Sequence, residues 1–389
     1  MQRSGLIRQK SKTTYDFAHL TFQEYFAAKD FDARGDSDGL LAHLGDPWWR
    51  EVILLFVGLQ RDATDLLERL RGHDLLVAGA ALADAQPVET EAFARVAHAI
   101  VAGLKGRIET DSSRRQGAAD ALAELQRPEA REYLAEQARE EGQPEAALAA
   151  VLALGKVADR ATLNRMWPQL GPTIRLLHGG LGRAGGELRK RILLVLERLG
   201  FPLVFIPAGE FVMGEDQSIH LGDYWIGKYP VTNAQFERFV NETKYQCKQD
   251  WRSEFTPGKE RHPVVNVTWH DALAFCKWAG VTLPSEAEWE KAARGTDGLT
   301  YPWGNQWDAG RCNVAELGTT PVDQYPNGMS PYGCYDMVGN AQEWTRSHDK
   351  EYPYDPDDGR EVLVLRPKSF DMFSGNLDFY VAFRIFCQM

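Results

Sequence analysis

The spacing of apolar residues changes near residue 200, from a helical period before it to short, irregular segments after it. In the first part, apolar residues recur every three or four positions, which predicts amphipathic helices; they include Leu122, Leu125, Leu134, Leu148, Val151, Leu152 and Leu163. The stretch 118–125 is followed about 30 residues later by a similar stretch, 148–155, as in arrays of stacked helical pairs. We therefore expect residues 1–200 to form an all-helical domain, either HEAT-like or an irregular helical array.

Two aromatic-rich stripes lie near the start of the chain. Each has a spacing that predicts a helix with one apolar face. The first consists of Phe17, Leu20, Tyr25 and Phe26, and the second of Trp49, Val52, Ile53 and Phe56.

Glycine, proline and aromatic residues become more frequent after Gly200–Phe201–Pro202, and only three of the 11 tryptophans precede residue 200. This change predicts a second domain, residues 201–389, with mixed α+β structure and many irregular loops. Thr232 is expected to cap a helix that carries Phe236 and Phe239. Ser285 and Glu288 have the spacing of a capping box.

Composition limits the function. The 389 residues are 44% apolar and 25% charged, as in ordinary globular proteins. The net charge of -11 argues against nucleic-acid binding and against binding to anionic membranes, because both need a basic face. The chain shows no apolar run long enough to span a bilayer and no signal-peptide pattern, so we expect a cytoplasmic protein. The five cysteines form no CxxC pair and are expected to be free thiols.

Three segments in this order carry a family resemblance: LPSEAEWEKAAR at 283–294, YPWG at 301–304 and DMVGNAQEW at 336–344. Together they resemble the formylglycine-generating-enzyme (sulfatase-modifying factor) family, whose domain is a form of the C-type lectin fold. Some members of that family are oxidases, while others use the scaffold to display a binding surface.

The resemblance implies no catalytic residues in this chain. The family's oxidases bind copper through a cysteine pair located between landmarks that here correspond to 366–370 and 382–384, and no cysteine lies between them. Soft thiolates are what hold Cu(I), so no copper is expected. The iron-binding His-x-x-x-His-x-Glu helix of related sulfoxide synthases is also missing. These absences count against the alternative reading, a formylglycine-generating or related metal-dependent oxidase.

The resemblance also implies calcium. One family site corresponds to Asp336, Gly339, Ala341 and Glu343, where two carboxylates and two carbonyls would supply hard oxygen ligands. A second, weaker site corresponds to Asn313 and Val314, but 315–320 shows no matching acid. Alternatively, Asp336 and Glu343 serve only to hydrogen-bond the loop.

Residues 366–383 depart most from the family pattern. We expect a binding surface formed by Asp371, Phe373, Ser374, Asn376, Asp378, Phe379 and Tyr380, flanked by Lys368 and Arg366, although a structural role is an equal alternative for Arg366. Those seven residues can all be reached from an asparagine codon by replacing adenines only, which resembles the variable proteins of diversity-generating retroelements. Aromatic anchors with small polar residues also suit a paratope, so we expect a macromolecular ligand, most simply a protein. A fixed-partner adaptor is a further alternative.

Residues 15–28 and 48–58 resemble the helical region behind NACHT-type signalling NTPases. The chain has no Gly-x-x-x-x-Gly-Lys-Ser/Thr loop, so no nucleotide binding of that type is expected. Two explanations stay open. Met1 is an internal start and the NTPase domain is missing, or the NTPase signalling partner is a separate chain.

Overall fold

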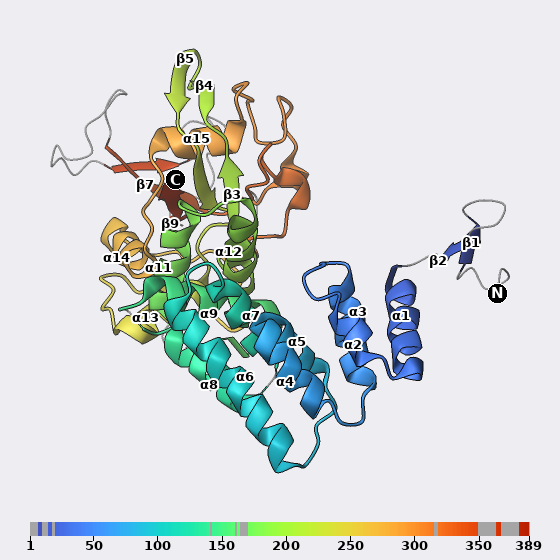
Figure 1. Ribbon diagram of the computed structural model, residues 1–389. Helices are drawn as coiled ribbons and strands as arrows, with labels where there is room; N and C mark the ends of the chain where they lie inside the picture. The colour runs from blue at the N-terminus through green and yellow to red at the C-terminus, as the bar shows by residue number, and fades with distance from the viewer. Residues whose placement is uncertain are drawn as a thin grey trace. The chain divides into compact units, whose positions relative to one another are not determined.

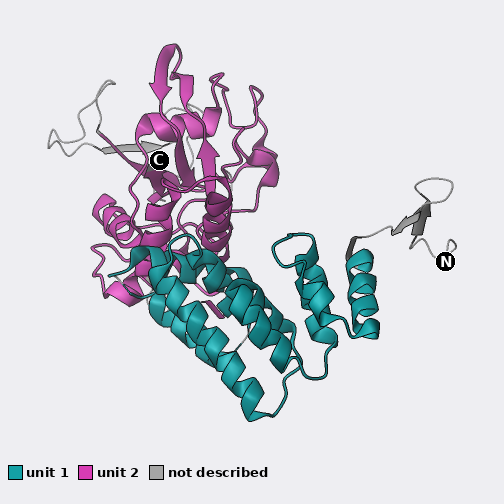
Figure 2. Cartoon of the chain, viewed as in Figure 1, with its two compact units in different colours: residues 1–158 teal, residues 159–389 magenta. Residues whose placement is uncertain are grey.

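The computed structural model describes residues 7–9, 15–17, 20–125, 127–140, 142–159, 162–163, 170–314, 318–348, 363–366 and 381–388. The chain divides into two compact units, residues 1–158 and 159–389 (Figure 2). The division therefore does not coincide with the change of composition at residue 200. Helices α11 (Leu170–Leu181) and α12 (Gly186–Leu199) have helical composition but belong to the second unit.

The first unit begins with a short antiparallel hairpin, after which every described element is a helix. Several helices begin where a side chain accepts hydrogen bonds from the first turn: Asp74 accepts from Leu76 and Val77, and Thr90 accepts from Phe93. None of the helices among the described residues is long and apolar enough to cross a lipid bilayer. The elements are β1 (Ile7–Gln9), β2 (Tyr15–Phe17), α1 (Leu20–Arg34), α2 (Ser37–Leu41), α3 (Trp49–Leu59), α4 (Thr64–His73), α5 (Leu75–Asp84), α6 (Glu91–Thr110), α7 (Arg115–Glu124), α8 (Pro128–Gln137) and α9 (Pro144–Val157).

The first predicted aromatic stripe is wrong in part. Phe17 lies in strand β2, because 15–17 pair with 7–9, and the helix begins only at Leu20. Tyr25 and Phe26 are 39% and 49% exposed, whereas Ala28 is fully buried. Tyr25 and Phe26 therefore do not lie on the buried face of α1. In the second stripe the aliphatic and phenylalanine positions are buried as predicted: Val52, Ile53 and Phe56.

Helices α7 and α9 run in the same direction. An ion pair joins their starts (Arg115 Nη1 to Glu145 Oε2, 2.8 Å), and another joins their ends (Lys156 Nζ to Glu124 Oε1, 2.6 Å). Because α8 lies between them in the sequence, α7 and α9 occupy equivalent positions in two successive helical pairs. The predicted helical character of the first region is confirmed, and its assignment as a HEAT-like array stays a prediction.

One sheet of the second unit joins the beginning and the end of the chain segment that follows α12. Its strand order is β10–β6–β3, all antiparallel, with β3 at Leu203–Ile206, β6 at Tyr224–Gly227 and β10 at Phe386–Gln388. The central strand is buried at every position, as expected for a strand paired on both edges. Strand β10 thus closes the sheet that β3 opens.

A second sheet has the order β8–β7–β9. Strand β7 (Gln342–His348) pairs antiparallel with β8 (Leu363–Arg366) and parallel with β9 (Val381–Phe383). Figure 1 shows the hairpin of β4 (Gly209–Met213) and β5 (Gln217–Leu221) at one end of this unit, and α11 to α14 at the other.

The predicted helix starts of the second unit are confirmed. Thr232 caps α13 (Asn233–Thr243), in a capping box with Gln235, and Ser285 with Glu288 forms the capping box of α15 (Glu286–Arg294). Helix α14 (Trp269–Ala279) is capped by Thr268. The unit is α+β, as predicted, and the finer assignment to the C-type lectin fold stays a prediction.

The core of the second unit packs α15 against the sheet of β3, β6 and β10. Its buried members are Ile206, Tyr224, Ile226, Trp289, Ala292, Ala293, Cys334, Met337 and Phe386. Lys291 is also fully buried, and its Nζ donates to the carbonyls of Pro207 (2.7 Å) and Gly209 (2.9 Å). This lysine thus ties α15 to the start of β4 and to the turn before it.

Candidate functional site

The loop 336–341 is shaped by three residues with left-handed backbone conformations. Asp336, Gly339 and Asn340 have φ values of 53°, 79° and 63°. At Gly339 only glycine fits, because a Cβ there would lie 2.4 Å from the carbonyl oxygen of Asn313. Asparagine and aspartate tolerate this conformation better than most residues. The loop leads directly into strand β7.

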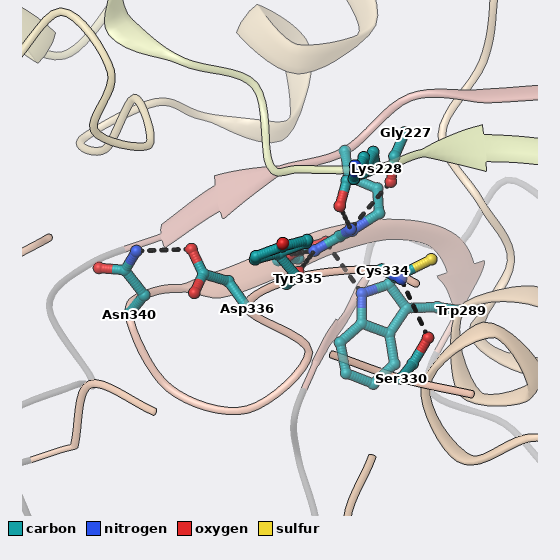
Figure 3. Close-up of polar contacts among 10 residues, drawn as sticks. Gly227, Lys228, Trp289, Ser330, Cys334, Tyr335, Asp336 and Asn340 are labelled. Carbon is teal, nitrogen blue, oxygen red and sulfur yellow. Dashed lines mark hydrogen bonds and ion pairs between the residues drawn. The ribbon is translucent and has the colours of Figure 1, made fainter. Parts of the chain in front are cut away.

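Asn340 holds this loop to the segment around Thr320. Its Oδ1 accepts from the Thr320 amide (2.8 Å), and its Nδ2 donates to the Thr320 carbonyl (3.0 Å). The same Nδ2 donates to Oδ2 of Asp336 at 2.7 Å (Figure 3). Asn313 Nδ2 donates to the Gly318 carbonyl at 2.8 Å. Because Asn340 is fully buried, these bonds compensate for the loss of water around its amide.

Asp336 is a buried carboxyl group beside this hub. Burial raises its pKa to about 7, although the hydrogen bond from Asn340 and the nearby Arg384 guanidinium favour the charged form. Near neutral pH the group therefore exchanges between its protonated and ionised forms.

Glu343 follows the loop and is bound on both oxygens. Its Oε2 accepts from Trp289 Nε1 (2.9 Å) and from Arg384 Nε (2.8 Å), and its Oε1 accepts from Arg384 Nη2 (2.7 Å). Arg384 also donates to the carbonyls of Gly227 and Lys228, at 2.9 and 3.3 Å, and to that of Tyr335 at 2.8 Å. All five guanidinium donors are thus used, which suits a buried charge.

The predicted first calcium site fits a cation only in part. Asp336 supplies a buried carboxylate, but both oxygens of Glu343 are held by an arginine and a tryptophan, and the Gly339 carbonyl accepts from the Ala341 amide (2.8 Å). Across the described part of the chain, no group of three or more His, Cys, Asp or Glu side chains could hold a metal. Asp336 and Glu343 both have roles in the fold without a cation, and calcium here stays a prediction.

Asn313, from the second predicted calcium site, belongs to the hydrogen-bond network around Asn340. The Asn313 carbonyl accepts from the Asn340 amide at 2.9 Å, and Val314 is half-buried beside it. The remaining ligands would fall within 315–320, and residues 315–317 of that stretch lie outside the described residues. This site, too, stays a prediction.

The predicted ligand segment is described only at its two ends. Arg366 ends β8 opposite Glu343, and Val381 begins β9 opposite Gln342. The remaining predicted contact residues lie outside the described part of the chain: Lys368, Asp371, Phe373, Ser374, Asn376, Asp378, Phe379 and Tyr380.

All five cysteines are free thiols, and four of them are buried. Burial raises the pKa of every one, to about 11 for Cys334 and Cys387. Cys387 lies in β10, paired with Trp225 of β6. None of these thiols is poised to be a thiolate at neutral pH.

The sequence interpretation missed Trp289, Asn340 and Arg384 as the residues that organise the site. A signal for Arg384 was available, because it is the one charged residue in the apolar run from Val381 to Cys387. A charge in such a run is rarely buried unless it is paired. Nothing local in the sequence identified its partner, which lies 41 positions earlier in the chain.

Comparison with known proteins places this site in a family domain. Residues 200–386 match the family described as the sulfatase-modifying factor enzyme 1-like domain. Residues 1–31 match the winged helix-turn-helix domain C-terminal to NACHT. We refer to residues 200–386 as the matched domain.

Three relatives illustrate the range of similar proteins. The Mus musculus protein named inactive C-alpha-formylglycine-generating enzyme 2 is 32% identical over 234 residues, covering 43% of this chain and 74% of that protein. The Bos taurus protein named formylglycine-generating enzyme is 33% identical over 215 residues, covering 37% and 57%. The Chlamydia trachomatis protein named serine/threonine-protein kinase Pkn1 is 36% identical over 180 residues, covering 39% and 28%.

Proposed function

Since this chain belongs to the sulfatase-modifying factor enzyme 1-like family, we propose that its matched domain is a non-catalytic member that binds a macromolecular ligand through residues 366–383. The observation that carries this proposal is the placement of the two ends of that segment. Arg366 and Val381 lie on strands that flank β7, beside Glu343 and Gln342. Both ends of the segment therefore lie at the same end of this sheet, beside the start of β7.

This arrangement suits a binding loop. Two strand spacings separate β8 from β9, or about 10 Å. Residues 367–380 form a far longer chain than is needed to cross that gap. Binding loops on other scaffolds are likewise long connections held at both ends by a rigid sheet.

The base of the segment is fixed by residues outside it. Glu343 is the strand partner of both Arg366 and Ala382, and its carboxylate is clamped by Arg384 and Trp289. Because these buried contacts are made by residues outside 367–380, a change of sequence within that segment leaves them in place. A diversified surface needs such a scaffold.

The state of the cysteines supports a non-catalytic role. The oxidases of this family depend on a cysteine pair, and this chain has no cysteine between residues 366 and 384. The nearest thiol in sequence, Cys387, is buried and has a pKa raised to about 11 by that burial. A protonated, buried thiol is a poor ligand for Cu(I).

The composition of the segment supports a protein ligand and diversification. Phe373, Phe379 and Tyr380 are aromatic anchors that lose little conformational entropy on binding, and the small polar residues add adaptable hydrogen bonds. All of these residue types can be reached from an asparagine codon by replacing adenines only, which is consistent with adenine-directed diversification by a retroelement. In this proposal the sequence of the segment varies while the scaffold stays constant.

The first 31 residues support a link to a signalling NTPase, because they match a domain that follows NACHT in other proteins. A domain similar to the matched one also forms part of a protein named as a kinase. We propose that ligand binding by the matched domain is relayed to an NTPase, in the same or another chain.

The gene itself tests the diversified-binder proposal. The 3′ end of the coding sequence is compared with the DNA immediately downstream. A near-identical downstream copy whose mismatches with the coding sequence fall only at its adenines establishes diversification. The mismatched codons then identify the contact residues. Absence of such a copy contradicts the retroelement origin and leaves a fixed-partner adaptor.

An enzyme assay tests the absence of catalysis. The purified protein is incubated with Cu(I), oxygen and a cysteine-containing sulfatase peptide, and conversion is followed by mass spectrometry. We expect no conversion above the peptide alone, with the Bos taurus enzyme as the positive control. Conversion would overturn the non-catalytic proposal and favour the oxidase alternative.

A further inference from the structure

Helix α11 lies outside the matched domain in sequence, yet one of its faces is bonded to that domain. Gly171, Arg175 and His178 are spaced so that they share this face. The Gly171 amide donates to Glu242 Oε2 (3.1 Å) and Arg175 Nη1 donates to the Trp278 carbonyl (2.9 Å). His178 Nδ1 lies 2.8 Å from the Ala279 carbonyl and donates to it.

The two basic side chains meet the end of α14. The last carbonyls of a helix have no partner within the helix and carry the negative end of its dipole. Arg175 and His178 supply donors to two of these carbonyls, at Trp278 and Ala279. Helix α14 then ends at Gly280 with φ of 70°, where a Cβ would lie 3.0 Å from the Arg175 Cα. The contact therefore requires a residue without a side chain at this point.

A second glycine allows the start of α11 to approach closely. A Cβ at Gly171 would lie 2.3 Å from Nε1 of Trp278, a buried ring. That indole nitrogen donates to the same Glu242 oxygen that accepts from Gly171 (3.0 Å). Glu242 is itself held by Arg238 Nε at 2.8 Å. The acceptor is therefore also held by two residues that lie outside α11.

Apolar burial supports these polar contacts. Ile174, Leu177 and Leu181 of α11 are also completely buried. His178 is 2% exposed, and from β10 the Cys387 Sγ lies 3.8 Å from the His178 carbonyl. Helix α11 thus contacts the strand that begins two residues after Arg384.

We propose that this surface, formed by Glu242, Trp278, Ala279 and Gly280, is a docking site for α11. Docking makes α11 and α12 one body with the matched domain, and this body is the relay that connects ligand binding to the residues before 159. The relay role rests on the proposed function, whereas the docking is independent of any ligand. The path is short, because only Val381 to Cys387 separate the end of the ligand segment from the strand that contacts α11.

The docking is tested in the full chain by hydrogen exchange of the α11 amides in two matched variants. Gly171→Ala places a Cβ against the Trp278 ring, whereas Gly179→Ala, in the same helix, places one where nothing lies within 4 Å. We expect Gly171→Ala to accelerate exchange across α11 at least tenfold, and Gly179→Ala to leave it unchanged or slower, since alanine favours helix. Equal exchange in both variants overturns the proposal.

A second pair of variants tests the docking even if Gly171→Ala misfolds. Arg175→Ala removes the donor to the Trp278 carbonyl, whereas Arg183→Ala removes an exposed arginine that bonds only to Gly179 of its own segment among the described contacts. Faster α11 exchange in Arg175→Ala alone, with the strands β3, β6 and β10 still protected, supports docking. No difference between the two arginine variants overturns it.

The two proposals can fail separately. If no adenine-directed copy lies downstream of the gene but α11 exchange responds as expected, the docking site stands and the diversified binder falls. If the copy is found and α11 exchange does not respond, the docking site falls and the binder stands.

Discussion

Arg384 and Glu343 form an ion pair that is completely buried, with 0% and 1% of their side chains exposed. Arg384 Nε lies 2.8 Å from Glu343 Oε2, and Nη2 lies 2.7 Å from Oε1. The arginine comes from the end of the chain and the glutamate from β7. This pair therefore fixes β7 to the residues between β9 and β10, which follow the candidate ligand segment.

Removing one partner of this pair is expected to be severe. Arg384→Ala leaves the Glu343 carboxylate buried without its counter-charge, and such changes cost about 3–5 kcal/mol of unfolding free energy. Urea unfolding followed by tryptophan fluorescence measures the change. Lys190→Ala, which removes one member of a mostly exposed pair with Glu187, is the control and should have no measurable effect. A loss below about 1 kcal/mol for Arg384→Ala would show that the pair does not anchor the fold.

Gly339→Ala tests the geometry of the loop 336–341. The variant is expected to lose about 2 kcal/mol or more, because it combines a left-handed backbone with a Cβ placed against the Asn313 carbonyl. Gly333→Ala is matched for backbone, with φ of 91°, but nothing lies within 4 Å of its Cβ. It should lose only about 1 kcal/mol. If the two variants are equally stable by thermal unfolding, the close approach to Asn313 is wrong.

His178 is expected to make the second unit sensitive to acid. Burial lowers its pKa from 6.5 to about 4, so the folded state resists protonation that the unfolded state accepts. The stabilisation from the neutral ring is therefore complete above pH 6.5 and falls as the pH drops toward 4, by up to about 3 kcal/mol.

The variant His178→Asn isolates that effect, because its amide nitrogen can still donate to the Ala279 carbonyl but does not titrate. The difference in unfolding free energy between wild type and variant is measured from pH 7.5 to 4. It should shrink as the pH falls. A difference that stays constant over this range would mean that His178 is not the titrating group.

Calcium binding at the loop can be tested through stability. If Asp336 is a ligand, calcium at 100 times its Kd stabilises the fold by about 2.7 kcal/mol, which raises the Tm. Asp336→Asn preserves an oxygen that can accept from Asn340 but removes the charge, and should abolish the shift. Asp216→Asn, at an exposed turn residue, should retain it. No calcium-dependent shift in the wild type would leave Asp336 with its hydrogen-bonding role alone.

The local features of the second unit could be predicted from the sequence alone. The capping box of Ser285 and Glu288 depends on residues three positions apart, and so does the cap formed by Thr232 and Gln235. Such contacts form within a single turn and need no knowledge of the remaining chain. The absence of a cysteine pair near the C-terminus was likewise visible without coordinates.

Sequence periodicity was less reliable where another segment competed for the same residues. Phe17 fits the helical period of the first aromatic stripe, but it pairs as a strand with Ile7. The change of composition at residue 200 coincides with the start of the matched domain, whereas the compact unit also includes α11 and α12, because α11 bonds to α14 about 100 positions later.

The sequence by itself determined the α+β character of the chain, its helix starts and its lack of oxidase cysteines, because these depend on residue type and short spacing. Only the tertiary structure decided that Glu343 belongs to Arg384 and Trp289, that Asn340 joins Asn313 and Thr320, and that α11 docks on α14. Those contacts join residues 20 to more than 100 positions apart. Buried polar groups must find hydrogen-bond partners once the core has packed, and packing decides which partners are within reach. A linear pattern of residues does not contain that information.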